Sequence, residues 1–341
     1  MLPMIRARAP LRISFGGGGT DVPPYCDERG GVVLSATINR YAYATLVPGG
    51  ETINVQSLDY DASISYGIDE SFVFDGQLDL AKGVIDHFRN RYTFKEGMSI
   101  LLHNDAPPGS GLGSSSAITV ALIAALLEYL RLPKDPYDIA ETAYRIERID
   151  VGQVGGKQDQ YAAAFGGFNF IEFNPDGTLV NPLRLKDETI FELEYRLVFA
   201  FVGGKRVFSD ILDKQVQNFK EKKLSAVDAM DAIKALAFDM KKALLTSNFD
   251  ELARLLDEGW VQKKRMAEGI TNPSIDAVYE LAKASGAQGG KITGAGGGGF
   301  MFFLCEPQRA HVVQEALREH GAQIVNFTFV EDGVRAWMVP A

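Results

Sequence analysis

Short apolar runs dominate the first half of the chain, whereas longer helical patterns dominate the second half. In the first half, β-branched and aromatic residues between turn residues predict strands at 6–15, 31–47, 52–58, 98–102, 168–173 and 178–185. Apolar residues at helical spacing predict helices at 80–89, 117–130 and 137–149. This mixture, with no internal repeat of 20 to 50 residues, predicts an α+β fold.

The second half begins with a predicted strand at 195–202. Helical patterns then follow at 209–222, 225–245, 250–266 and 274–284. A strand at 300–305, a helix at 308–320 and strands at 324–330 and 334–339 are expected to finish an α+β domain. The charged stretch 186–189 is the predicted boundary, so we expect one domain at 1–187 and a second at 188–341.

The length and charge of the chain narrow its function. With 341 residues, of which 46% are hydrophobic, the chain is long enough for two domains with full cores. Its net charge is −9 and it has no basic block, which disfavours nucleic acid or an anionic membrane as the main partner. A phosphorylated small molecule would therefore need a local basic pocket.

Cysteine and histidine usage points to a protein without a structural metal site. Cys26 and Cys305 lie far apart and lack metal-ligand spacing, as expected for a reduced cytoplasmic protein. The four histidines form no HExxH pair. We expect no signal peptide, and the longest apolar run, of about fourteen residues at 117–130, is too short to span a bilayer.

A glycine- and serine-rich stretch, PPGSGLGSSSA at 107–117, lies between a predicted strand and a predicted helix. Glycines let the backbone approach an anion, and a helix N-terminus adds about half a positive charge, so this order of elements favours phosphate binding. The stretch lacks the Gly-Lys-Ser/Thr ending of a Walker A loop. Its serines can cap the helix or bind Mg²⁺. The alternative is a plain loop.

A second glycine cluster occupies residues 16–19, directly after the first predicted strand, and Thr20 and Asp21 follow it. Four consecutive glycines cost conformational entropy on folding, which close contact with a ligand would offset. The alternative is a flexible turn without a function. Asp21, ahead of Pro23-Pro24-Tyr25, provides a polar group at the edge of this loop.

Two further carboxylates stand out beside helical segments. Glu147 lies next to the apolar stripe of the helix predicted at 137–149, so it needs a partner, either Arg145 or Arg148 or a metal ion. Asp159 follows a glycine-broken loop, where it can cap a helical turn. Lys157, two residues away, would supply a cation that keeps this carboxylate ionised, an arrangement that also suits a catalytic site.

The three glycine clusters, at 16–19, 109–113 and 294–299, resemble in order the three motifs of the GHMP small-molecule kinases. RAPLRISFGGGGTD is similar to the first motif, PPGSGLGSSSA to the second and KITGAGGGGF to the third. Together with GGVVLSATI and GGKQDQYAAAFGG, the first segment also resembles the D-glycero-D-manno-heptose 7-phosphate kinase branch. Fucokinase-type and other sugar kinases share part of these narrower segments.

The resemblance implies a two-domain GHMP kinase fold, with an N-terminal domain like ribosomal protein S5 domain 2 and a ferredoxin-like C-terminal domain. It implies an ATP- and Mg²⁺-dependent kinase acting on the anomeric hydroxyl of a sugar, with D-glycero-D-manno-heptose 7-phosphate as the best candidate. Another fucokinase- or galactokinase-like activity remains open, as does a regulator that binds sugar and ATP without turnover. A homodimer is the candidate assembly.

The resemblance also assigns roles to residues. Asp159 is the expected catalytic aspartate, Arg12 lies near the transferring phosphoryl group, and Glu147 and Ser115 bind Mg²⁺, with Ser114 as the alternative serine. The residues expected at the ATP phosphates are Pro108, Gly109, Ser110, Gly111, Leu112, Gly113, Ser114, Ser115 and Ser116. The residues expected at the sugar are Gly18, Gly19, Thr20, Asp21, Tyr25, Lys205, Arg206, Gly296 and Gly297. Among these, Asp21 matches the aspartate that binds sugar hydroxyls.

A phosphorylated sugar needs cationic contacts of its own. The chain offers Lys205 and Arg206 after a predicted strand, and Lys291 beside the third glycine cluster. We expect Arg206 and Lys205 to bind the sugar phosphate; the alternative is that these side chains simply face solvent.

Overall fold

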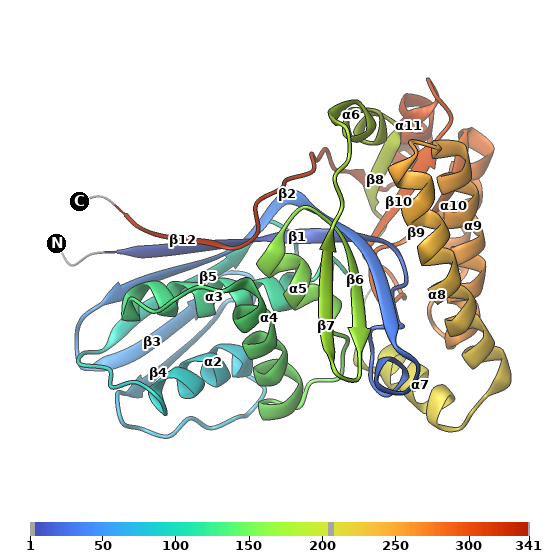
Figure 1. The fold of residues 1–341 in the computed structure, drawn as a ribbon. Coiled ribbons are helices and arrows are strands. Elements are labelled where there is room, and N and C mark those ends of the chain that lie inside the picture. The colour runs from blue at the N-terminus through green and yellow to red at the C-terminus, as the bar shows by residue number, and fades with distance from the viewer. Residues whose placement is uncertain (1–3, 204–207, 340–341) are drawn as a thin grey trace.

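The computed structural model describes residues 4–203 and 208–339. Within them the chain forms two β-sheets, each covered by helices (Figure 1). The first sheet comes mostly from the first half of the chain and the second sheet from the second half. The mixed α/β content confirms the predicted fold class, and none of the described helices has the length and apolarity needed to cross a bilayer.

In the described residues, the first sheet has eight strands. Its main path runs β12-β1-β2-β5-β3-β4, and β6 pairs with β2 and β7. The pair β3 and β5 is parallel, and β1 and β2 are antiparallel. The strands are β1 (Ile5–Gly16), β2 (Gly31–Pro48), β3 (Thr52–Ser57), β4 (Ala62–Gly67), β5 (Met98–Asn104), β6 (Phe168–Asn174), β7 (Gly177–Pro182) and β12 (Arg335–Met338).

The long strand β2 links the parts of this sheet. Residues 31–36 pair with β6, residues 42–48 pair with β5, and β1 pairs with β2 on both sides of a register shift. Residues 31–38 are all buried, whereas burial alternates from residue 41 onwards. This change shows that the sheet is covered on both faces near β6 and on one face near β5.

Helices cover the first sheet, with α3 at their centre. They are α1 (Tyr25–Arg29), α2 (Asp79–Arg89), α3 (Ser114–Leu130), α4 (Pro136–Arg145), the π-helix η1 (Ile146–Asp150) and α5 (Gln158–Phe165). Helix α6 (Asp187–Arg196) instead contacts β10 (Phe300–Cys305) of the second sheet. Helix α3 packs on β1, β2 and β12 and is flanked by α2, α4 and α5. Its sequence is apolar nearly all round because neighbours surround it.

The second sheet is antiparallel, in the order β11-β8-β10-β9. Its strands are β8 (Leu197–Phe201), β9 (Ala287–Ile292), β10 (Phe300–Cys305) and β11 (Gln323–Ile324), and its helices are α7 (Phe208–Lys220), α8 (Leu224–Leu245), α9 (Phe249–Met266), α10 (Pro273–Ser285) and α11 (Ala310–Glu319). Helix α9 approaches β9 closely: a Cβ on Gly289 would lie 2.0 Å from the Ala253 carbonyl oxygen. Glycine in β9 therefore permits this packing.

Several predictions of elements were wrong. The last strand does not finish the second sheet, because β12 lies beside the start of β1 and pairs with it in the first sheet (Figure 1). The strand expected at 324–330 is only Gln323–Ile324. Helix α6 was not expected, and it begins within the charged stretch 186–189, where Asp187 and Glu188 suit its first turn. The domain boundary placed at this stretch stays a prediction. The chain therefore returns to its first sheet after completing the second.

Candidate active site

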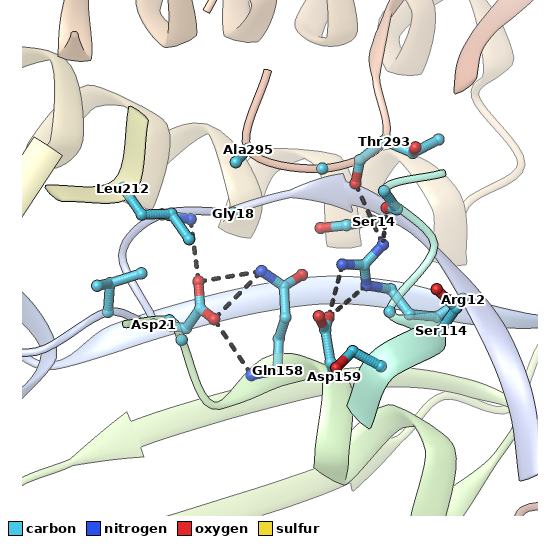
Figure 2. Close-up of a pocket in the computed structure, with 18 of the residues that line it drawn as sticks. Arg12, Ser14, Gly18, Asp21, Ser114, Gln158, Asp159, Leu212, Thr293 and Ala295 are labelled. Carbon is cyan, nitrogen blue, oxygen red and sulfur yellow. Dashed lines mark hydrogen bonds and ion pairs between the residues drawn. The ribbon is translucent and has the colours of Figure 1, made fainter. Parts of the chain in front are cut away.

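Arg12, near the end of β1, brings the three glycine-rich segments together. Its Nη1 donates hydrogen bonds to the carbonyl oxygens of Gly111, at 2.7 Å, and Thr293, at 3.2 Å. Its backbone N–H donates to the Leu112 carbonyl oxygen, at 3.1 Å. A Cβ on Gly294 would lie 2.9 Å from Gly111 Cα. Segments nearly 300 positions apart in the chain therefore meet at one buried guanidinium (Figure 2).

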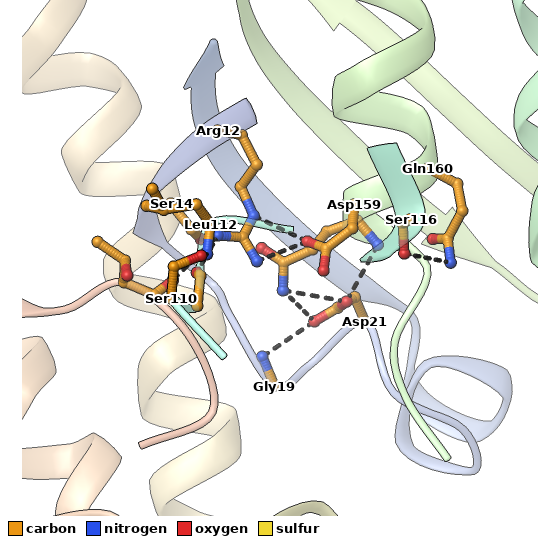
Figure 3. Close-up of polar contacts among 12 residues, drawn as sticks. Arg12, Ser14, Gly19, Asp21, Ser110, Leu112, Ser116, Asp159 and Gln160 are labelled. Atoms are coloured by element: carbon orange, nitrogen blue, oxygen red, sulfur yellow. Dashed lines mark hydrogen bonds and ion pairs between the residues drawn. The ribbon is translucent and has the colours of Figure 1, made fainter. Parts of the chain in front are cut away.

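The same guanidinium holds Asp159, the second residue of α5. Arg12 Nε and Nη2 lie 2.8 and 2.6 Å from Asp159 Oδ1 (Figures 2 and 3). Both contacts use the same carboxylate oxygen, so Oδ2 is left without a partner in the described residues. The second glycine segment also approaches this carboxylate, because a Cβ on Gly113 would lie 3.1 Å from Asp159 Cγ. Two features therefore favour glycine at position 113: its φ of +77 and the closeness of the Asp159 carboxylate.

The N-terminus of α3 opens beside this pair. Gly113 is the N-cap residue and supplies no side-chain hydrogen bond to the first turn. Ser114 and Ser115 follow it, and both line the adjoining cavity. Backbone N–H groups of a first turn that lack a capping side chain, together with the helix dipole, form a site for an anion.

At the other end of the cavity, Asp21 is fully buried and held by the chain itself. It accepts hydrogen bonds from the backbone N–H groups of Gly19, at 2.9 Å, and Gln158, at 3.1 Å. The Gln158 side-chain amide donates to both of its oxygens. A Cβ on Gly156 would lie 1.9 Å from Asp21 Oδ2, so glycine is required there. Asp21 thus fixes the first glycine loop against the start of α5 (Figure 3).

These groups line a cavity of about 300 Å³, whose lining residues come from both halves of the chain. Four of its lining residues are cationic, Arg12, Arg148, Lys263 and Lys291, and two are carboxylates, Asp21 and Asp159. Burial lowers the pKa of Lys263 to about 8, although Asp21 opposes this shift. Burial, together with Lys263 and Arg12, lowers the pKa of Lys291 well below its ordinary value.

Glu147 lies in η1 beneath the N-terminus of α3 and is fully buried. Its Oε2 accepts hydrogen bonds from Ser116 Oγ, at 2.8 Å, and Gln160 Nε2, at 2.7 Å, and lies 3.2 Å from Arg148. The ion-pair alternative for Glu147 is therefore present, with Arg148 as the partner. Burial raises the pKa of Glu147, against the opposing effects of Arg148 and its hydrogen bonds.

The same residues fit a magnesium ion. Glu147 Oε1 is buried and has no hydrogen-bond partner in the described residues. The described chain holds no cluster of three or more His, Cys, Asp or Glu side chains suited to a metal. Mg²⁺ bound with nucleotide phosphates needs only one or two protein carboxylates. Ser116 adjoins Glu147, whereas Ser115, the serine expected on the metal, is exposed at the cavity.

A second cavity, of about 370 Å³, shares Ser114 and Ser115 with the first one. Its walls include apolar side chains such as Leu78, Leu102 and Ile118. The sequence did not indicate this cavity, because much of its lining comes from α2, the loop before α2 and the turn after β3, which carry no recognisable motif. It adjoins the N-terminus of α3 on the side away from Asp21.

The structure brings many of the predicted residues together. Those that line the first cavity are Arg12, Gly18, Gly19, Asp21, Gly109, Gly111, Gly113, Ser114, Ser115 and Asp159. Pro108 lines the second cavity. Ser110, Leu112 and Ser116 are buried beneath the loop. Lys205 and Arg206 lie outside the described residues.

Other predicted residues make contacts within the fold. Thr20 Oγ1 lies 2.8 Å from the Gly17 carbonyl oxygen and 2.9 Å from the Val32 carbonyl oxygen, either of which can accept its one hydrogen. Tyr25 is buried, and its hydroxyl donates a hydrogen bond to Asp231. The Lys157 ammonium lies 3.5 Å from Asp27 and over the Tyr144 ring, so the cation beside Asp159 is Arg12 and not Lys157. A Cβ on Gly296 would meet Ile270, and one on Gly297 would meet Ile211, so these glycines permit packing.

Sequence reasoning missed Ser14, Gln158 and Lys263 as lining residues. Ser14 follows Arg12 by two positions on a strand, so both side chains lie on one face, and this period could have indicated it. Gln158 directly precedes Asp159 at the start of α5. Lys263 carried no comparable signal, because it stands in a run of charged residues on a helix.

Comparison with known proteins agrees with this geometry. Residues 79–167 match the family model of the GHMP kinases N terminal domain, and residues 240–323 match that of the GHMP kinases C terminal domain. The chain is 42% identical to the D-glycero-alpha-D-manno-heptose 7-phosphate kinase of Campylobacter jejuni, over 98% of this chain and 99% of that protein. It therefore belongs to the GHMP kinase family.

Two further comparisons place the chain within that family. The structure of a D-glycero-D-manno-heptose 1-phosphate kinase from Bacteroides thetaiotaomicron superimposes with a TM-score of 0.84 at 38% identity, over 99% of this chain and 100% of that one. A bifunctional fucokinase/GDP-fucose pyrophosphorylase from Arabidopsis thaliana is 27% identical over 92% of this chain, which spans 31% of that protein. The chain is a kinase of this family, and the three relatives described here are named for sugars.

Proposed function

We propose that this kinase transfers the terminal phosphoryl group of ATP, with Mg²⁺, to the anomeric hydroxyl of a heptose. The best candidate acceptor is D-glycero-D-manno-heptose 7-phosphate, which would become the 1,7-bisphosphate during nucleotide-activated heptose synthesis. The observation that carries the proposal is the Arg12–Asp159 pair, which lies between the N-terminus of α3 and the loop containing Asp21 (Figure 2). The name of the 42% identical relative supports the sugar.

The two cavities suit the two substrates. The apolar walls of the second cavity favour a nucleoside, whose phosphates would reach the uncapped N–H groups of Ser114 and Ser115. The first cavity, with its carboxylates and cations, favours a polyol. An ATP-consuming reaction also agrees with the cytoplasmic location expected from the two free cysteines.

In the proposed reaction the chain positions the reactants and stabilises charge. Asp159 Oδ2 would accept a hydrogen bond from the acceptor hydroxyl and take its proton as the bond to phosphorus forms, while Arg12 keeps the carboxylate oriented through Oδ1. Arg12 also places positive charge beside the transferred group. Glu147 and a serine of 114–116 would hold Mg²⁺, which neutralises charge on the ATP phosphates.

The test is a comparison of the unaltered chain with Asp159→Asn. We expect ADP formation with the heptose 7-phosphate, and a product phosphorylated at the anomeric carbon by ³¹P and ¹³C NMR. Because the amide cannot accept the proton, Asp159→Asn should lower kcat by about 10²- to 10⁴-fold, while ATP binding measured by calorimetry is retained. Fucose and galactose serve as alternative acceptors. ADP formation with these sugars alone, or unchanged turnover in the variant, would contradict the proposal.

A further inference from the structure

The charge of the first cavity contrasts with that of the chain. The chain has a net charge of −9, yet four cationic side chains and two carboxylates line this cavity. Arg12 is paired with Asp159, and Arg148 lies beside Glu147. The two lysines, Lys263 and Lys291, are the cationic lining residues that remain to be explained.

Both lysines are buried and lack an acidic partner. Lys263, on α9, is 5% exposed, and Lys291, on β9, is 7% exposed. Lys263 Nζ donates to the Gly18 carbonyl oxygen at 3.0 Å, and Lys291 Nζ donates to the Ser14 carbonyl oxygen at 2.7 Å. Neither has a carboxylate within 4.0 Å in the described residues. Since an ammonium has three donors, each lysine keeps two of them unused.

The groups around the lysines neither neutralise their charge nor use their free N–H donors. Asp21 attracts Lys263, but its oxygens already accept hydrogen bonds from Gly19 and Gln158. Arg12 repels both lysines, and Lys263 repels Lys291. The hydroxyl of Ser14, which also lines the cavity, is buried without a hydrogen-bond partner in the described part of the chain. Unused donors and unpaired charge of this kind are costly unless a ligand supplies the acceptors.

We propose that Lys263, Lys291 and Ser14 form a subsite for a phosphoryl group that the acceptor sugar already carries. This inference rests on the proposed function and names the residues that would select a phosphorylated acceptor. A phosphate dianion offers several strong acceptor oxygens, which match the spare N–H groups of two lysines and one hydroxyl. Lys205 and Arg206, the phosphate contacts expected from the sequence, lie outside the described residues and stay a prediction.

The positions of the contacted residues along β1 favour the acceptor sugar, and not ATP, as the molecule whose phosphate binds to the lysines. Arg12 contacts Gly111 in the loop before α3, whereas Ser14 and Gly18, the residues that the lysines contact, come later in β1 and its following loop. In Figure 2, Gly18 and Asp21 lie at one end of the drawn pocket and Ser114 at the other, with Asp159 between them. Gly18, which Lys263 contacts, therefore lies at the end that holds Asp21, and Ser14, which Lys291 contacts, precedes it on β1.

Kinetics with a matched pair of acceptors tests the subsite. Lys263→Met and Lys291→Met remove the charge and keep most of the side-chain volume. Each should raise KM for heptose 7-phosphate by about 10- to 100-fold, because a charge-assisted hydrogen bond is lost. KM for ATP should change by less than about threefold, because the lysines lie outside the proposed nucleotide site, and the loss of kcat/KM for the unphosphorylated heptose should be smaller than the loss for heptose 7-phosphate. Lys264→Met, on the neighbouring position of α9, is the control and should change none of these values.

Calorimetry without ATP provides a second measurement. The unaltered chain should bind heptose 7-phosphate more tightly than the heptose, and Lys263→Met should abolish that difference. Circular dichroism checks that each variant is folded. Lys263→Arg keeps the charge, so it should retain part of the affinity for heptose 7-phosphate that Lys263→Met loses. The pair Lys263→Met and Lys263→Arg still tests the subsite if Lys291→Met does not fold. Equal losses of affinity for the two sugars would show that the lysines only hold β1 in place. A rise in KM for ATP alone would assign the lysines to the nucleotide site. Either result overturns the subsite.

These results separate the subsite from the proposed function. If the unaltered chain forms no ADP with any heptose, the proposed function is wrong. If it phosphorylates heptose 7-phosphate but the variants affect both sugars equally, only the subsite is wrong.

Discussion

Lys82 and Lys263 are both buried lysines, but their surroundings differ completely. Lys82, on α2, is fully buried and donates to Asp75 at 2.6 Å, to Asp79 at 3.1 Å and to the Val73 carbonyl oxygen at 2.7 Å. All three of its donors are used within one short segment of chain. Lys263 donates only to a backbone carbonyl oxygen and has no carboxylate within 4.0 Å in the described residues.

The pKa values of the two lysines follow from this difference. Burial alone would lower the pKa of Lys82, but its hydrogen bonds to Asp75 and Asp79 outweigh burial, so that pKa is raised. Burial lowers the pKa of Lys263 to about 8, because Asp21 compensates only in part. A buried cation whose counter-ion belongs to the chain stabilises the fold. A buried cation without one indicates that an anionic ligand completes the site.

The largest effect on stability is expected for Lys82→Met. The variant leaves Asp75 and Asp79 without their cation and releases the loop 73–79. We expect the free energy of unfolding to fall by about 2 to 4 kcal/mol, toward the low end of values for broken buried pairs because Asp75 is half exposed. Urea denaturation measures this change.

A surface pair provides the control for Lys82. Lys134 pairs with Glu128 at the surface, so Lys134→Met should cost less than about 1 kcal/mol. Because Gly76, Gln77 and Leu78 line the second cavity, Lys82→Met should also raise KM for ATP. Equal losses of stability in the two variants would remove the distinction between Lys82 and a surface lysine.

Lys263→Met is expected to have the opposite effect on stability, an increase, when no substrate is bound. Replacing an unpaired buried ammonium by an apolar side chain of similar size should raise the free energy of unfolding at pH 7 by about 1 to 3 kcal/mol. Lys264→Met, which removes a half-buried lysine next to it, should change stability by less than about 0.5 kcal/mol. A loss of stability in Lys263→Met would mean that the ammonium is satisfied within the chain.

The pH dependence of stability sharpens the same comparison. Below pH 8, Lys263 is protonated in the folded and the unfolded chain, so the folded chain carries the full cost of burying the charge. Between pH 8 and its ordinary value of 10.5, the unfolded chain binds more protons, and stability therefore rises with pH through this window. Denaturation of the unaltered chain and Lys263→Met at pH 7, 8, 9 and 10 should show the gap between them narrowing as pH rises. A constant gap would contradict the lowered pKa.

The two lysines also show what the sequence could indicate. The sequence indicated the glycine segments because glycine is needed there for the local backbone conformation. It indicated Arg12 and Asp159 because they accompany those segments. Lys263 stands beside Lys264 and Arg265, and only the packing of α9 against the first glycine loop decides which of the three is buried. Strand β12 was misassigned for the same reason, since its partner β1 lies more than 300 positions earlier.

The smallest effect on stability is expected for Ser14→Ala. Ser14 lies opposite Ser35 in the pairing of β1 with β2, and both hydroxyls are buried without a hydrogen-bond partner in the described residues. Removing either hydroxyl should therefore change the free energy of unfolding by less than about 0.5 kcal/mol, because no internal hydrogen bond is lost. Only Ser14 lines the first cavity, so Ser14→Ala should raise KM for heptose 7-phosphate by about three- to tenfold, whereas Ser35→Ala should leave it unchanged. Equal KM values in the two variants would show that the orphaned hydroxyl of Ser14 is as inert as that of Ser35, and that the lysines bind without it.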